Sequence, residues 1–142
     1  MFSITVDLDD SLVDPIYEHV HHGRCFMLFE QARLALLKDM GMPNEMLLQR
    51  GEVLVITRAE ASYLREVRGS KVTVTCDEAL LNGRELVIYQ RILNEKEKVA
   101  VRARIVSVFM DMGTRRGLNI PQDFLEAFRE LEIFRDRIGA DL

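Results

Sequence analysis

The sequence predicts an α+β domain in which an antiparallel sheet of about five strands wraps around one long central helix, with an extra helix near the C-terminal end. Two observations support this fold class. Residues 22–40 are apolar around more than half of a helical circumference, which indicates a helix buried on most sides. Residues 52–112 then show the alternating, β-branched patterns of consecutive strands, without a second long helix between them.

The composition is that of an ordinary soluble protein. A chain of 142 residues is long enough to bury one core and short for two, so we expect a single domain over residues 1–142. Hydrophobic residues make up 48% and charged residues 30% of the chain. The net charge is −4 and no block of Lys or Arg stands out, so nucleic acid is not an expected partner.

The cysteines and the apolar segments indicate the compartment. Cys25 and Cys76 are far apart in sequence and have no metal-binding spacing, which favours buried thiols in a reducing compartment. No basic leader precedes an apolar stretch, and no run approaches the roughly 18 apolar residues of a membrane span. We therefore expect a cytoplasmic protein with no membrane partner.

The N-terminal part contains a strand and a loop. Residues 3–9 alternate enough for a first strand. Residues 10–20 are expected to be irregular, because Pro15 disfavours helical geometry at Asp14.

The central helix is expected from about residue 22 to residue 40, with no turn residue after Gly23. Gly41 can cap its C-terminal end, and Pro43 can open a short helical turn after it. Its apolar residues at helical spacing are Phe26, Met27, Phe29, Ala32, Leu34, Leu36, Leu37 and Met40.

The rest of the chain consists mainly of strands. Residues 52–67 are long and rich in β-branched residues. Asn82 and Gly83 lie between two alternating runs in residues 71–93, which is a strong signal for a hairpin. Residues 99–112 form the last strand of the meander.

A final helix is expected at about residues 121–138, where apolar residues return to helical spacing. A sheet of about five strands leaves unpaired edges and covers only part of the central helix. Self-association into a homodimer or homotetramer would cover both.

Several motifs in this order resemble the hotdog-fold thioesterases, specifically the hydroxybenzoyl-CoA and acyl-CoA thioesterase group. They are "FEQAR" in the helix, "EASYLREVRGSKVTV" and "VSVFMDMGTRRGLNIP". The similarity runs from about Phe2 to Pro121. It implies a hotdog fold, an acyl-CoA substrate and hydrolysis of its thioester, and we expect no cofactor.

The resemblance also places the site. That group has an Asp in the loop before the helix, and here Pro15 holds this position, so Asp14 is displaced by one residue. Glu18 stands for the usual Gly, and Cys25 for the usual helix Tyr. The helix motif Glu-x-Ala-Arg is matched from Glu30 to Arg33, and these two charges are expected to form a structural pair.

The chemistry of a thioester hydrolase gives these residues roles. Asp14 is the predicted catalytic carboxylate, Glu18 is its rival, and His22 is a further catalytic candidate. Backbone N–H groups near His22 and Gly23 would stabilise an oxyanion at the helix start. The residues predicted to contact substrate are Tyr17, His19, Gly23 and Tyr63.

Each prediction has a structural alternative. Asp14 suits a turn, Glu18 suits a solvated loop, and His22 suits a helix cap or a dimer interface. His19, His21 and His22 have no recognised metal-ligand spacing, so no metal is expected. The predicted function is an acyl-CoA thioesterase, and the alternative is a non-catalytic hotdog protein that binds acyl-CoA or an acyl carrier.

Overall fold

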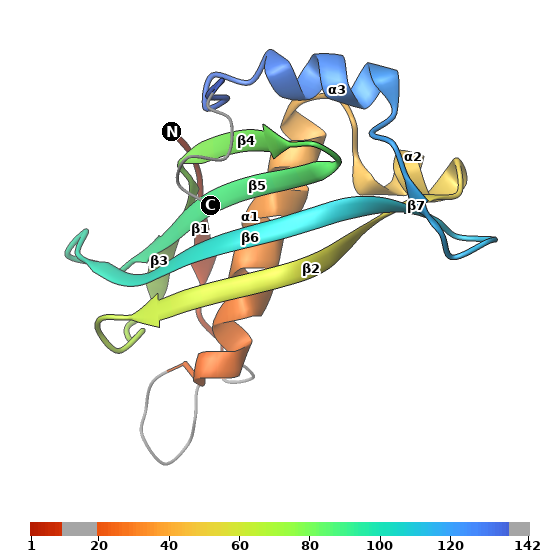
Figure 1. Cartoon of the computed structure of the whole chain (residues 1–142). Helices are drawn as coiled ribbons and strands as arrows, with labels where there is room; N and C mark the ends of the chain where they lie inside the picture. Colours follow the sequence, from red (N-terminus) through yellow and green to blue (C-terminus); the bar gives the residue numbers. More distant parts are fainter. Residues whose placement is uncertain (10–19, 137–142) are drawn as a thin grey trace.

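One antiparallel sheet dominates the computed structural model, which describes residues 1–9 and 20–136 (Figure 1). Within these residues five strands follow the order β1-β3-β5-β6-β2, while β4 pairs with β5 and β7 pairs with β6. The strands are β1 (Phe2–Asp7), β2 (Glu52–Tyr63), β3 (Lys71–Cys76), β4 (Glu78–Asn82), β5 (Glu85–Leu93), β6 (Val99–Asp111) and β7 (Gly117–Leu118). The α+β class and the antiparallel meander predicted from the sequence are confirmed.

The central helix α1 (Cys25–Asp39) crosses one face of the sheet, directly after a 3-10 turn at His22–Arg24 (Figure 1). Gly41, with a φ of 79°, follows the helix, in agreement with its predicted role as a C-terminal cap. The helix residues that are buried against the sheet are Cys25, Leu28, Phe29, Ala32, Leu36 and Leu37. Met27 and Leu34 are exposed, so the described residues leave this face of α1 uncovered.

The strand run expected at residues 71–82 is divided at Asp77, and both halves pair with β5. The Asp77 N–H donates to the Tyr89 carbonyl at 2.7 Å, and the Asp77 carboxylate accepts two bonds from Arg91 at 2.8 and 2.9 Å. These contacts hold the bend between β3 and β4. The predicted hairpin at Asn82 and Gly83 is confirmed, with Gly83 at a φ of 62°.

The long strand β2 ends at Tyr63, four residues earlier than expected, because the chain turns back there onto neighbouring segments. The N–H groups of Leu64 and Arg65 both donate to the Ala100 carbonyl, at 2.8 and 3.0 Å. The Val67 carbonyl accepts a bond from the Val20 N–H at 2.8 Å. Residues 64–67 therefore lie beside the start of α1.

Two short helices complete the described structure, α2 (Asn44–Gln49) and α3 (Gln122–Arg129). The last helix was expected to run to about residue 138, but it ends at Arg129. The chain then pairs with the edge of β4, where Ala79 donates to the Ile133 carbonyl at 3.0 Å and accepts from the Arg135 N–H at 2.9 Å. This backbone pairing replaces further helical turns.

The main core lies between α1 and the concave face of the sheet, and α3 covers its upper end (Figure 1). Phe124 and Phe128 of α3 are both 1% exposed, and the Phe124 ring meets Phe109 edge-on at 4.9 Å between centroids. A smaller apolar cluster of Leu80, Val87 and Val106 is separate from the main core. No helix in the described part of the chain is long and apolar enough to cross a membrane.

Candidate functional site

A cavity of about 390 Å³ lies where α1 begins. Val20, His22 and Cys25 line one side, and the segment that follows β2, from Tyr63 to Val67, lines the other. The structure thus brings together two of the predicted site residues, His22 and Tyr63, which are far apart in sequence. The Tyr63 hydroxyl donates to the His22 carbonyl at 2.8 Å, and the two rings meet edge-on at 6.1 Å.

The phenol of Tyr63 and the thiol of Cys25 are both protonated near neutral pH. Burial raises the pKa of Cys25 to about 11, and Cys25 is 1% exposed. Burial, followed by the nearby Cys25, raises the pKa of Tyr63. Cys25 is therefore a packing residue and not a nucleophile, whereas Tyr63 keeps the proton it needs as a donor.

Gly23 lies at the predicted oxyanion position, and its N–H donates to Nδ1 of His21 at 3.1 Å. The His21 ring also stacks on the His22 ring, with centroids 4.2 Å apart and planes 30° apart. No sequence pattern predicts this bond, because it depends on a side-chain rotamer. A substrate oxygen can accept a hydrogen bond from the Gly23 N–H only if it displaces the His21 imidazole.

The other predicted site residues, Asp14, Tyr17, Glu18 and His19, lie outside the described residues. The described residues on either side of them bond to the segment between β2 and β3, in which Val67 lines the cavity. The Leu8 N–H donates to the Ser70 carbonyl and the Val20 N–H to the Val67 carbonyl, each at 2.8 Å.

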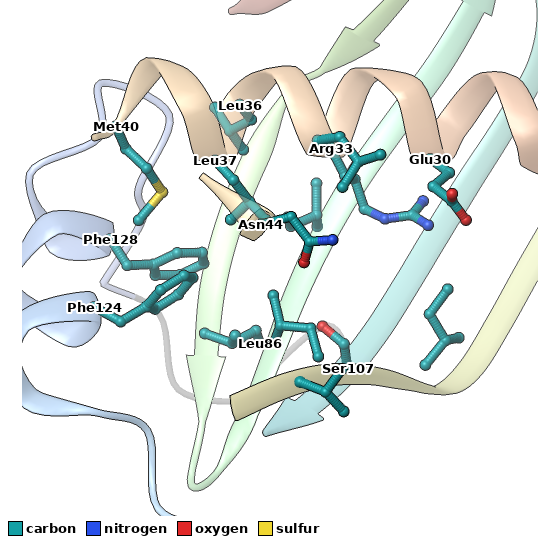
Figure 2. Close-up of a pocket in the computed structure, with 15 residues that line it drawn as sticks. Glu30, Arg33, Leu36, Leu37, Met40, Asn44, Leu86, Ser107, Phe124 and Phe128 are labelled. Atoms are coloured by element: carbon teal, nitrogen blue, oxygen red, sulfur yellow. The ribbon is translucent and has the colours of Figure 1, made fainter. Parts of the chain in front are cut away.

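A second cavity, of about 230 Å³, lies between α1, α3 and the strands β2, β5 and β6 (Figure 2). Glu30 and Arg33 of α1, Asn44 of α2 and Ser107 of β6 supply its polar groups. Its lining comes from segments spread over most of the sequence, so no local motif could have indicated it.

Arg33 does not form the expected pair with Glu30. Its Nη1 donates to Oε1 of Gln90 at 2.9 Å. Gln90 is 1% exposed, and its amide nitrogen donates to the carbonyls of Phe29 at 3.0 Å and Thr75 at 3.3 Å. The buried amide offers a fixed acceptor that the exposed Glu30 does not.

No cluster of three or more His, Cys, Asp or Glu side chains that could hold a metal ion occurs within residues 1–9 and 20–136. Among the described residues, the polar side chains that line the cavity at the helix start are the imidazole of His22, the phenol of Tyr63, the guanidinium of Arg65 and the carboxylate of Glu66.

A curved antiparallel sheet around one central helix, as seen here, is the architecture of the hotdog class of proteins. A family model described as the thioesterase-like superfamily matches residues 6–128, and the chain belongs to this superfamily. No curated protein gave a significant sequence match.

Solved structures agree with this fold at low sequence identity. The DHNA-CoA thioesterase from Staphylococcus aureus is 18% identical with a TM-score of 0.78, over 89% of this chain and 87% of that one. A 1,4-dihydroxy-2-naphthoyl-CoA thioesterase from Synechocystis is 14% identical with a TM-score of 0.82, over 92% and 96%. A Staphylococcus aureus protein solved in complex with CoA is 16% identical with a TM-score of 0.75, over 89% and 80%.

Proposed function

We propose that this protein hydrolyses the thioester of an acyl-CoA to a free acid and CoA, in the cavity at the start of α1. The main support is the position of that cavity: it lies at the N-terminal end of the central helix of a thioesterase-like chain, and the predicted His22 and Tyr63 line it. The similar Staphylococcus aureus structure that contains CoA supports a CoA-linked substrate.

In the proposed reaction the carboxylate of Asp14 takes a proton from a water molecule, whose oxygen bonds to the thioester carbon. The carbonyl electron pair moves onto the oxygen, and N–H groups near His22 and Gly23 stabilise this oxyanion. Collapse of the oxyanion breaks the C–S bond, and the proton held by Asp14 passes to the sulfur of CoA. In a second route the Asp14 carboxylate attacks the carbon itself and the C–S bond breaks, which releases the CoA thiolate and leaves a mixed anhydride. Water then cleaves the anhydride to the free acid and the Asp14 carboxylate, and the proton that is released passes to the thiolate.

The remaining predicted residues have supporting roles. Tyr63 fixes the first turn through its bond to the His22 carbonyl. His22 lines the cavity and is proposed to contact the acyl-CoA. Tyr17 and His19 are proposed to contact the substrate, and Glu18 is the alternative carboxylate.

A non-catalytic protein that binds acyl-CoA or an acyl carrier is the second candidate. The bond between the Gly23 N–H and His21 favours it, because a donor that the reaction would need is already occupied. The displaced Asp14 and the side chain of Glu18 at the usual Gly position favour it as well.

We further propose that two copies associate through β2, which pairs with β6 on one side and is the last strand of the sheet order in the described residues. Ile56 of β2 is 46% exposed and Leu64, just after it, is 49% exposed. A homodimer would cover these side chains, and pairs of dimers would give the alternative homotetramer.

Two buried free thiols are consistent with a cytoplasmic location.

Hydrolysis by the full chain tests the function. The substrates are short-chain, long-chain and aromatic acyl-CoAs, and release of the CoA thiol is followed with a thiol reagent. We expect repeated turnovers on at least one class. Tight binding measured by calorimetry, without thiol release from any substrate, would support the binding protein instead. Neither binding nor release would contradict both candidates.

A further inference from the structure

The second cavity combines one cationic side chain with apolar walls. Figure 2 shows Arg33 on α1 near one end, and Phe124 and Phe128 of α3 at the other. Leu37 and Leu86 line the space between them. We propose that this cavity binds a small apolar carboxylic acid, with the carboxylate on Arg33 and the apolar body against the two phenylalanines. This inference does not rest on the proposed function.

Arg33 carries a positive charge that no acidic side chain neutralises by an ion pair within residues 1–9 and 20–136. A guanidinium has five N–H donors, and the one bond described for Arg33 goes to the neutral amide of Gln90. Burial lowers the pKa of Arg33, while Cys76 and then Glu30 act in the opposite direction. A carboxylate that binds two N–H groups in parallel is the natural complement of such a guanidinium.

The position of Arg33 is fixed before any ligand arrives. Gln90 is held in place by its own bonds to the Phe29 and Thr75 carbonyls, and it presents Oε1 to Arg33. The ligand therefore meets a cation whose side-chain entropy has already been lost, which lowers the free-energy cost of binding.

The apolar lining and the volume of the cavity determine the chemistry and the size of the part of the ligand beyond its carboxylate. Phe124 and Phe128 lie in nearly parallel planes, 22° apart, with ring centroids separated by 6.0 Å. These apolar surfaces exclude inorganic phosphate or sulfate as the preferred ligand. At about 230 Å³ the cavity is smaller than the ~300–1,000 Å³ typical of drug-sized ligands, so the acid has a short chain or a single ring system. Asn44 and Ser107 lie along the cavity and can bind a polar substituent.

Glu30 provides a second, opposite test of the charge argument. Its side chain is exposed and lines the cavity on the same helix as Arg33. Because its negative charge repels an acid, Glu30→Gln should strengthen binding. Because the side chain is exposed, this variant should fold like the wild type.

The experiment is calorimetry of the full chain with octanoate and with naphthoate, each beside the alcohol of the same carbon skeleton. We expect each acid to bind at least about tenfold more tightly than its alcohol, because the carboxylate brings a charge opposite to that of Arg33 and can accept two parallel hydrogen bonds from it, which the alcohol cannot. Arg33→Gln should weaken binding of the acid about 10- to 100-fold. Arg84→Gln is the matched control, since Arg84 bonds to Asn119 and does not line the cavity.

Three outcomes would overturn the proposal: no binding of either acid at millimolar concentration, equal affinity for acid and alcohol, or wild-type affinity in a folded Arg33→Gln variant. If Arg33→Gln does not fold, the affinity of the Glu30→Gln variant for the acid decides. Tighter binding than in the wild type supports the proposal, and unchanged or weaker binding contradicts it. The ligands contain no thioester, so failure of acyl-CoA hydrolysis would leave this result unaffected.

Discussion

At the scale of single residues, the bond between the Gly23 N–H and Nδ1 of His21 determines what the first turn of the helix can offer a substrate. Exchanging this neutral bond for one to a substrate oxygen costs at most about 0.5–1.5 kcal/mol. An N–H group that stabilises an oxyanion contributes about 2.7–4 kcal/mol to catalysis. The exchange is therefore compatible with a catalytic role for Gly23.

The two thiols give a prediction at the same scale. Cys25 and Cys76 are 1% and 0% exposed, and burial raises their pKa values to about 11 and about 12. In the native protein at about pH 8, both should react with an alkylating reagent at least about 100-fold more slowly than an ordinary exposed thiol. Both should react rapidly after denaturation. Mass spectrometry identifies the modified residue, and fast native modification of Cys25 would contradict its packing role.

Part of the site could be predicted from the sequence. Gly23 and His22 could be placed because the loop and the apolar helix are contiguous, and Tyr63 was placed by the family resemblance. The His21 contact could not be predicted, since it is set by one rotamer. The prediction that Arg33 pairs with Glu30 was wrong. Its partner is Gln90, which lies 57 residues away in sequence, and the burial of Gln90 depends on the whole sheet.

At the scale of elements, the sequence predicted the segments whose residue pattern is regular along their length. In α1, β5 and β6 this pattern follows from burial against the core, whereas β2 contains no fully buried residue and was predicted from its β-branched residues. The predictions differ from the structure where a tertiary contact interrupts the period. The strand at residues 71–82 bends at Asp77, which is bound to Arg91. The last helix stops at Arg129, and the chain that follows pairs with β4 through Ile133 and Arg135.

The central helix should be the element on which stability most depends. Phe29 is 0% exposed, so Phe29→Ala should lower the free energy of unfolding by about 3–5 kcal/mol. Lys38, on the same helix, is exposed and outside the proposed interface, and Lys38→Ala should change the free energy of unfolding by less than about 0.5 kcal/mol. Urea denaturation measures both, and equal midpoints for the two variants would show that α1 is not the core.

The attachment of α3 should depend on pH. Arg50 donates two bonds to the Asp123 carboxylate, at 2.7 and 3.0 Å, and these bonds lower the pKa of Asp123 below its usual range. The bonds therefore contribute stability above the unfolded pKa of about 3.9, and this contribution disappears as the pH falls through the lower folded pKa.

Asp123→Asn should consequently lower the Tm at about pH 7 and have little effect at about pH 2. Glu126→Gln is the control, because the Glu126 carboxylate bonds to Gln122 on the same helix and not to an arginine. Scanning calorimetry at the two pH values makes the comparison. An equal loss of Tm at both would show that the ion pair does not hold α3.

At the scale of the whole molecule, the exposed apolar side chains point to association between copies. Met27 of α1 and Ile56 of β2 are 55% and 46% exposed, and β2 is the last strand of the sheet order in the described residues. Light scattering at micromolar concentration should therefore give the mass of two or four chains. A monomeric mass would contradict the proposed assembly.

A variant can locate the contact. Ile56→Glu places a charge on the proposed interface and should shift the protein toward the monomer. Thr5→Glu is the control, because Thr5 is exposed on β1, at the opposite end of the sheet order. Equal masses for the two variants would place the interface elsewhere.

The central claim, carboxylate-assisted hydrolysis at the start of α1, is tested most directly by comparing Asp14→Asn with Glu18→Gln. The measurement is turnover of an acyl-CoA that the wild type hydrolyses, with folding of both variants checked by circular dichroism. Asp14→Asn keeps the shape of the side chain but removes the base, so turnover should fall about 10²–10⁴-fold. Glu18→Gln should retain most of its turnover. Full turnover in Asp14→Asn would contradict the account, and its loss in Glu18→Gln alone would assign the reaction to Glu18.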